Sequence, residues 1–180
     1  MKEGTNKTVD AAIKASSGGN VTIQNVGTIN FGKDHVLNAD QGFHAFGGTI
    51  TVNANNIYGN VNGFGFLMSQ CLRGHEGNLK VNAQHDVNLT SVRQPLVVAG
   101  IFQDTSDDKG NLLTTTNKIQ AQNKVYLHTK SSQNGSISIY DQKNTIGKGN
   151  ANIEISGNKG VNIENDDGIG IYSYLVGQNN

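Results

Sequence analysis

Two polar, glycine-containing stretches hold the side chains that we single out as candidates for chemistry or binding. They span residues 70–78 and 103–111. Loops that project from a regular scaffold commonly carry binding residues, so we expect both stretches to bulge from the fold and contact a partner. The candidate binding residues are the charged or titratable side chains within them: Arg73, His75, Glu76, Asp104, Asp107, Asp108 and Lys109.

The spacing of these residues does not match a known catalytic motif. The "HEG" at residues 75–77 lacks the second histidine that a zinc-binding helix places four residues after the first. The adjacent acidic pairs, Asp107–Asp108 and Asp166–Asp167, are followed by glycine, a pattern typical of turns. We therefore expect no catalytic residues, no cofactor and no enzymatic activity.

A calcium site is not favoured either. The segment "DTSDDKGNLLTT" begins like a calcium-binding loop, but Thr115 stands at its twelfth position, where such loops carry glutamate. The glycine–aspartate nonapeptide of calcium-binding β-rolls is absent from the sequence. We therefore expect no bound metal.

Composition excludes several functions. The chain has 180 residues, which favours one domain, and its 14 basic and 14 acidic residues give no net charge. Without a basic stripe, a nucleic-acid partner is not expected, and no apolar run is long enough to insert into a membrane. Cys71 is the single cysteine, so it has no internal disulfide partner and is expected to be a buried thiol.

Apolar residues recur in alternating triplets at fixed intervals. The pairs Ile137/Ile139, Ile153/Ile155 and Ile169/Ile171 are each 16 residues apart. Four apolar positions in "VNAQHDVNL" recur 38 residues later in "IQAQNKVYL", which we interpret as two turns of about 19 residues. Alternation predicts short half-buried strands, and their regular return, separated by Gly and Asn turns, predicts a solenoid.

The predicted fold is all-β: a right-handed parallel β-helix with roughly 16–20 residues per coil. It would form a single segment over residues 1–180, with a short helix or cap within residues 1–19, the helix being Thr8–Ala15. Phe64 and Phe66 are expected to stack inside it, and stacked Asn side chains to form ladders. The triplets predict strands at 20–23, 28–31, 43–46, 49–54, 64–69, 79–83, 87–90, 96–102, 112–115, 118–121, 125–129, 136–140, 152–155, 161–164 and 169–174.

Three segments carry a family resemblance: "GTITVNANNIYGN", "GNLKVNAQHDVNLTS" and "NKIQAQNKVYLHTKSSQNGSISI". They resemble passenger-domain repeats of bacterial autotransporter adhesins and filamentous haemagglutinin-type exoproteins, over about residues 20–174. The resemblance implies a secreted rod at the bacterial outer membrane, acting in cell adhesion and biofilm formation. Its partners would be receptors or glycans of host or bacterial cells, or copies of itself. The family's signal peptide and translocator have no match, so we interpret the chain as an excised part of a longer passenger.

Two alternatives stay open at this point. A carbohydrate-active β-helix enzyme, a polysaccharide lyase or hydrolase, would need carboxylates and basic side chains in one groove. The chain has two arginines, Arg73 and Arg93, which are few for a basic groove. The other alternative is an inert structural spacer that lifts another domain from the cell surface.

Overall fold

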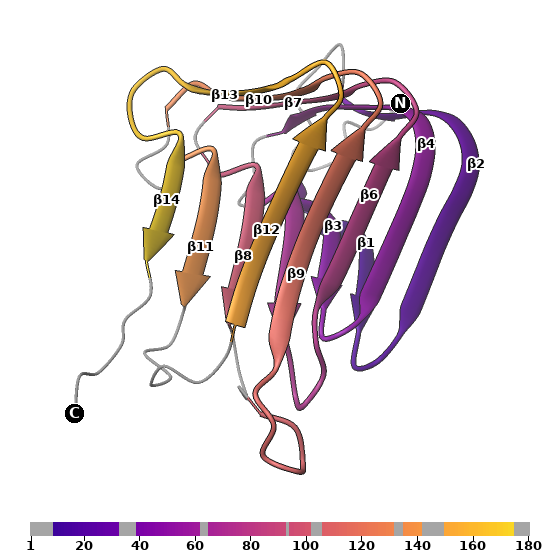
Figure 1. Ribbon diagram of the computed structural model, residues 1–180, viewed down its shortest axis with the longest axis vertical. Coiled ribbons are helices and arrows are strands. Elements are labelled where there is room, and N and C mark those ends of the chain that lie inside the picture. The colour runs from indigo at the N-terminus through magenta and orange to yellow at the C-terminus, as the bar shows by residue number, and fades with distance from the viewer. Residues whose placement is uncertain are drawn as a thin grey trace, which may run out of the picture.

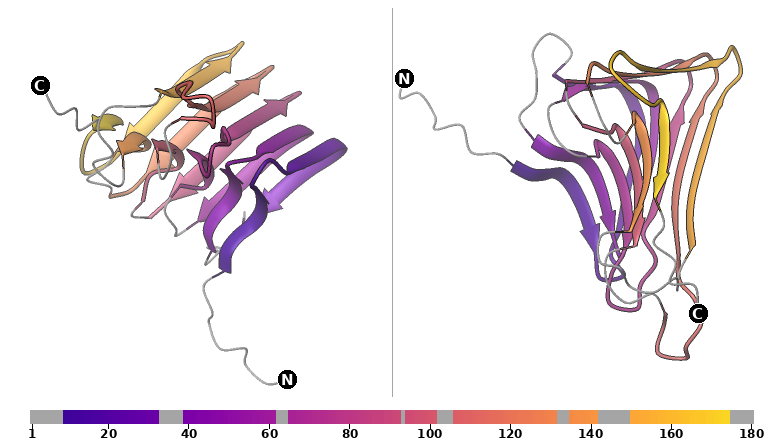
Figure 2. Two further views of the ribbon diagram at one scale, coloured as in Figure 1. Left: turned by 90° about the horizontal axis from the view of Figure 1, so that it is seen from below. Right: turned by 90° about the vertical axis from the view of Figure 1, so that its left-hand side faces the viewer.

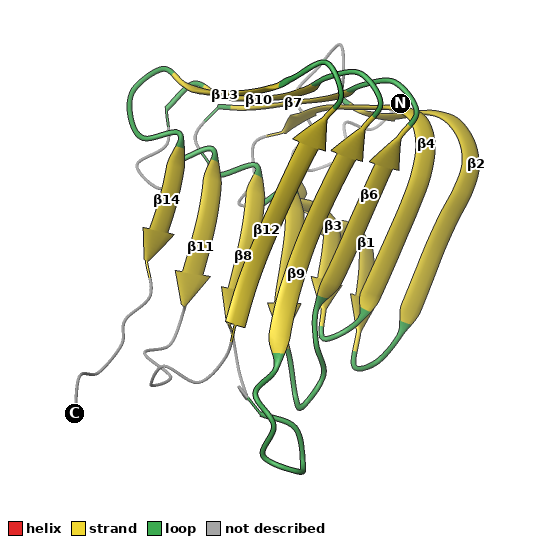
Figure 3. Cartoon of the chain, viewed as in Figure 1, coloured by secondary structure: helices red, strands yellow, loops and turns green. Residues whose placement is uncertain are grey.

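The computed structural model is built from strands, with no helix among the residues it describes (Figures 1 and 3). It describes residues 9–32, 39–61, 65–92, 94–101, 106–131, 135–141 and 150–174. Every pairing between its named strands is parallel. In this part of the chain, no helix is long and apolar enough to cross a membrane.

One sheet has six strands, each from a different part of the chain. In spatial order they are β1 (Val9–Ser16), β3 (Ala39–Phe46), β5 (Leu67–Cys71), β8 (Val97–Ile101), β11 (Ile137–Asp141) and β14 (Ile171–Tyr174). The order follows the sequence, so each successive strand is added to the same edge of the sheet. Between two neighbours the chain leaves this sheet and returns to it (Figure 1).

The second sheet has eight strands and bends along its length. Its members are β2 (Asn20–Phe31), β4 (Thr49–Val61), β6 (Asn78–Ala83), β7 (Val87–Ser91), β9 (Thr114–Ala121), β10 (Val125–Thr129), β12 (Asn150–Gly157) and β13 (Val161–Asn165). The first half of β4 pairs with β6 and its second half with β7. Beyond the bend, β7, β10 and β13 run across the top of the molecule (Figures 1 and 2).

Strand register shows how far the chain travels before it returns to the same place. Val81 pairs with Ile119, and Leu89 pairs with Leu127, so the partners lie 38 residues apart. The prediction of 16–20 residues per coil is therefore wrong. The 16-residue interval separates strands of different sheets, because Ile139 lies in β11 of the six-stranded sheet and Ile155 lies in β12 of the eight-stranded sheet.

The core lies between the sheets and consists of stacked rows of apolar side chains. One row runs from Ile57 through Val87 and Val125 to Val161, one residue from each of four neighbouring strands. The first three are fully buried, while Val161 on the last strand is 40% exposed. The rows form because residues of like spacing in parallel strands meet at the same level, so apolar triplets stack on one another.

Three phenylalanines pack against one another in this core. Phe31 contacts Phe43 and Phe66 edge to face, with ring centroids 5.2 Å apart in both pairs. Phe66 is 1% exposed, as predicted, whereas Phe64 lies outside the described residues. One step of the expected amide ladder is present: Asn82 donates to Asn53 at 2.8 Å between β6 and β4.

The predicted helix at Thr8–Ala15 is wrong over its described part. Residues Val9–Ser16 form β1, and Ile13 pairs with Phe43 of β3. Ala11, Ile13 and Ala15 alternate with residues that are exposed in the structure, Ala12, Lys14 and Ser16, because an extended chain places alternate residues on one face. A helix of eight residues is marginal by itself, and parallel pairing with β3 offers this segment more contacts. Thr8 lies outside the described residues.

Most of the other predicted strands lie within observed ones. The two predicted at 112–115 and 118–121 belong to a single strand, β9, which begins at Thr114. Cys71 ends β5 and is 1% exposed, which confirms the expected buried thiol.

Candidate functional site

Two tyrosines and two asparagines form a straight row on the outer side of the bent sheet. Tyr58 of β4 pairs with Asn88 of β7, which pairs with Tyr126 of β10, which pairs with Asn162 of β13. They point outward because their sequence neighbours are the apolar residues that point into the core. The sequence supplies each one as the polar residue between two apolar ones, as in "IYG" and "VYL".

A second row lies two residues further along the same strands. It consists of Asn60, Thr90, His128 and Glu164, again in register. We call the two rows together the tyrosine face: Tyr58, Asn60, Asn88, Thr90, Tyr126, His128, Asn162 and Glu164. The face combines aromatic rings, amides and titratable groups within one regular surface.

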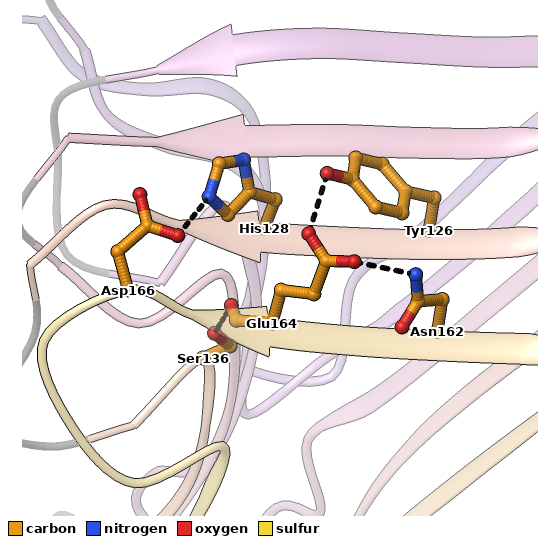
Figure 4. Close-up of polar contacts among 6 residues, drawn as sticks. All are labelled: Tyr126, His128, Ser136, Asn162, Glu164 and Asp166. Atoms are coloured by element: carbon orange, nitrogen blue, oxygen red, sulfur yellow. Dashed lines mark hydrogen bonds and ion pairs between the residues drawn. The ribbon is translucent and has the colours of Figure 1, made fainter.

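Hydrogen bonds hold the side chains at one end of this face (Figure 4). Tyr126 Oη donates to Glu164 Oε2 at 2.9 Å, and Asn162 Nδ2 donates to Glu164 Oε1 at 2.7 Å. Desolvation, followed by the hydrogen bond and the charge of Glu164, raises the pKa of the Tyr126 phenol above 10.0. The phenol thus stays protonated at neutral pH, and both carboxylate oxygens of Glu164 have donors.

A histidine–aspartate pair lies beside this cluster. His128 Nε2 lies 2.8 Å from Asp166 Oδ1, with the histidine side chain 20% exposed and the aspartate 56%. The main-chain N–H of Asp166 donates to the carbonyl of Thr129 at 3.1 Å, which fixes the residue after β13. The hydroxyl of the nearby buried Ser136 donates to the main-chain carbonyl of Glu164. That serine is therefore not placed as a nucleophile for the pair (Figure 4).

Hollows follow the tyrosine face across its strands. One of about 200 Å³ lies beside Tyr58 and Asn88, and a second of about 260 Å³ extends from Tyr58 to Tyr126. A third, of about 380 Å³, lies on the other side of Tyr126 and reaches Asn162. Because neighbouring hollows share lining residues, they form one shallow track from β4 to β13. Such a track suits an elongated ligand with apolar faces and hydrogen-bonding edges.

The two loops predicted to bind a partner meet at a different corner of the molecule. The first is a tight turn in which Leu72 bridges to His75, with Arg73 in a left-handed conformation at φ 49°. Glu76 Oε1 accepts a 3.1 Å hydrogen bond from the main-chain N–H of Thr114, where the second loop leads into β9. Register thus brings the two predicted stretches together, and the side chains of Arg73, His75 and Glu76 are exposed.

Asp107 closes the turn of the second loop. Its carboxylate accepts hydrogen bonds from the main-chain N–H groups of Lys109 and Asn111, at 2.9 and 2.8 Å, and from the Asn111 side chain at 2.8 Å. The side-chain and main-chain bonds from Asn111 lower the pKa of Asp107 below 3.8. Asp108 and Lys109 are exposed at the tip, and Asp104 lies outside the described residues. Asp107 therefore has a structural role in this loop.

The loops and the tyrosine face lie far apart. The 106–113 loop projects at the bottom of Figure 1, whereas β7, β10 and β13 cross the top. Sequence reasoning selected the loops and missed the face. The available signal was that Tyr58 and Tyr126 occupy equivalent places in their triplets, each between two core residues.

Neither a search for metal-binding clusters nor a comparison with known proteins assigns a function to these residues. Within the described ranges, no group of three or more His, Cys, Asp or Glu side chains could hold a metal ion. Comparison of the chain with protein-family models, curated proteins and solved structures gives no match.

Proposed function

We propose that this chain is a segment of a right-handed parallel β-helix in a bacterial surface adhesin, and that it binds saccharides through the tyrosine face. The continuous parallel pairing and the stacked apolar rows support the β-helix. The resemblance of its repeats to adhesin passengers supports a secreted, surface-displayed rod. The partner would be a glycan on a host or bacterial cell.

The observation that carries this proposal is the spacing of the two tyrosines. Tyr58 and Tyr126 are separated by one strand, so their backbones lie about 10 Å apart at the usual spacing of about 4.8 Å between strands. Asn88 lies between them and Asn162 beyond them. A sugar ring has an apolar C–H face that packs on an aromatic ring and hydroxyl edges that bond amides. The face offers both in alternation along one line.

The chemistry of the face favours binding over catalysis. Both oxygens of Glu164 accept hydrogen bonds from neighbouring side chains, and Asp166 is paired with His128. These carboxylates thus make contacts that fix the positions of neighbouring side chains on this surface. An adhesin needs no reaction, because many weak contacts on repeated copies give firm attachment through multivalency.

The test is a comparison of purified variants on immobilised glycans and on whole cells. Replacing Tyr58 and Tyr126 together by alanine removes both rings and is expected to weaken binding about tenfold or more, since stacking on an aromatic side chain contributes about 1–3 kcal/mol. The matched control is the double variant Arg73→Ala/Asp108→Ala in the distant loops, which should bind as the parent does. Urea unfolding of all three proteins verifies that each is folded.

Two outcomes would contradict the proposal. If the loop variant loses binding and the tyrosine variant keeps it, the corner loops are the binding site. If the parent binds no glycan and no cell, the segment is a structural spacer.

A further inference from the structure

Two lysines flank the largest hollow of the tyrosine face. Lys124 and Lys159 line the hollow of about 380 Å³ together with Tyr126, Val161 and Asn162. No acidic side chain lines this hollow. The hollow therefore combines an aromatic wall, an amide and two positive charges.

The fold fixes the backbone positions of both lysines. Each lies in a short turn that leads into a strand, Lys124 before β10 and Lys159 before β13. The main-chain N–H of Lys124 donates to Asp86 Oδ1 at 3.1 Å, and that of Lys159 donates to the carbonyl of Asn123 at 2.8 Å. The two side chains therefore start from neighbouring turns on the same side of the sheet.

Neither lysine ammonium group has an acidic partner, whereas the nearby acidic side chains accept hydrogen bonds from other groups. Within the part of the chain that the structure describes, Lys124 and Lys159 form no ion pair, although Lys118 on another face pairs with Glu154 at 3.1 Å. Glu164 accepts hydrogen bonds from Tyr126 and Asn162. Asp86 accepts the main-chain N–H of Lys124. The two lysines are thus the charged side chains that line this hollow, whereas Glu164 and Asp86 lie outside its lining.

From this geometry we propose that the hollow binds an acidic sugar unit, with its carboxylate or sulfate between Lys124 and Lys159 and its ring against Tyr126. The inference rests on the proposed saccharide-binding function and specifies the ligand class. The rest of the oligosaccharide would extend over Asn88 toward Tyr58, away from the lysines. An anion is favoured at the lysine end alone, because Glu164 and Asp166 lie further along the strands and would repel it there.

The experiment measures binding of fluorescent oligosaccharides to the full chain. The probes are hyaluronan oligosaccharides with their carboxyl-reduced counterparts, and chondroitin sulfate oligosaccharides with their desulfated counterparts. We expect at least one acidic probe to bind about tenfold more tightly than its neutral counterpart, since its anionic group would form an exposed ion pair with each of the two lysines. This preference should shrink as salt is raised.

Variants locate the effect. Lys124→Gln/Lys159→Gln should abolish the preference, so that this variant binds the acidic probe and its neutral counterpart equally. Lys80→Gln on β6 is the matched control, because Lys80 is also exposed but does not line the hollow, and it should retain the preference. Urea unfolding midpoints should agree among the three proteins.

Each result decides a different point. Equal binding of acidic and neutral probes would overturn the acidic-sugar assignment and leave the saccharide-binding proposal in place. An acidic preference that survives Lys124→Gln/Lys159→Gln would also overturn the assignment. Absence of binding to every probe, with Tyr58→Ala/Tyr126→Ala also without effect on cells, would overturn both.

Discussion

The phenol of Tyr126 on β10 donates a 2.9 Å hydrogen bond to the carboxylate of Glu164 on β13, joining two side chains 38 residues apart in the sequence. The bond fixes the position of the ring over the sheet. Because the phenol O–H donates its hydrogen bond to Glu164, the hydroxyl is not available to donate to a ligand. In the proposed site, the ring is then the part of Tyr126 that contacts the saccharide.

Substitutions at Tyr126 separate the ring from its hydroxyl. Tyr126→Phe keeps the ring, so saccharide binding should stay within about threefold of the parent, whereas Tyr126→Ala should weaken it about tenfold. Loss of one hydrogen bond should lower the free energy of unfolding of Tyr126→Phe by about 0.5–1.5 kcal/mol. Titration calorimetry and urea unfolding provide the two measurements. If phenylalanine is as harmful to binding as alanine, the hydroxyl is the recognition element.

The raised pKa of Tyr126 predicts a loss of stability in alkali. The folded protein holds the phenol proton more tightly than the unfolded chain, whose pKa is near 10.0, so this group's contribution is complete below that pH. It is lost as the pH rises through the higher pKa of the folded state. Unfolding of the parent and of Tyr126→Phe between pH 8 and 12 provides the measurement, and the parent should lose more stability. Parallel curves would show that Tyr126 is not coupled to folding.

The strands could be predicted from the sequence because their signal is local. An alternating apolar triplet reports directly that one side of a short segment is buried, as in β13, where Val161 and Ile163 point inward. The distance around the fold is not local. Triplets of successive strands and triplets of stacked strands look alike, and only the pairing of Val81 with Ile119 shows that the 38-residue interval brings the chain back once.

The tyrosine face was missed for a related reason. Tyr58, Asn88 and Tyr126 are single residues, 30 and 38 apart, and nothing in their immediate sequence connects them. Only the strand register places them in one row. The loops, in contrast, can be recognised from their polar, glycine-containing composition. Composition does not reveal that the Asp107 carboxylate accepts hydrogen bonds within its own turn.

Gly42 is required by its contact with Phe66. A Cβ atom at this position would overlap the Phe66 ring, which belongs to the aromatic cluster of the core. Gly42→Ala should therefore lower the free energy of unfolding by about 1–3 kcal/mol, the usual effect of overpacking. Gly27→Ala is the control, because no heavy atom lies within 4 Å of its Cβ position. Urea unfolding measures both, and equal stability of the two variants would contradict the packing described here.

The thiol of Cys71 should be inert in the folded protein. Burial raises its pKa above 9.0, with a smaller contribution from the Glu76 charge, partly opposed by a hydrogen bond from the main chain of Gly77. A thiolate is the reactive form, so both burial and the raised pKa slow the reaction. Reaction with Ellman's reagent at pH 8 should be slow in buffer and fast in concentrated urea. Rapid labelling in buffer would show that the end of β5 opens.

The turn closed by Asp107 should respond to acid separately from the rest of the molecule. Because Asn111 lowers the pKa of Asp107, the order of this loop is complete above pH 3.8 and is lost as the pH falls through the lower pKa of the folded state.

Asp107→Ala removes the acceptor for the N–H groups of Lys109 and Asn111, so hydrogen exchange at these two amides should become faster at neutral pH. Asp108→Ala is the matched control, since Asp108 is exposed and is not one of the acceptors that close the turn. The urea midpoint should be the same in both variants, because the loop projects from the sheets and contributes little to the core. A lowered midpoint in Asp107→Ala alone would mean that the loop is part of the cooperative fold.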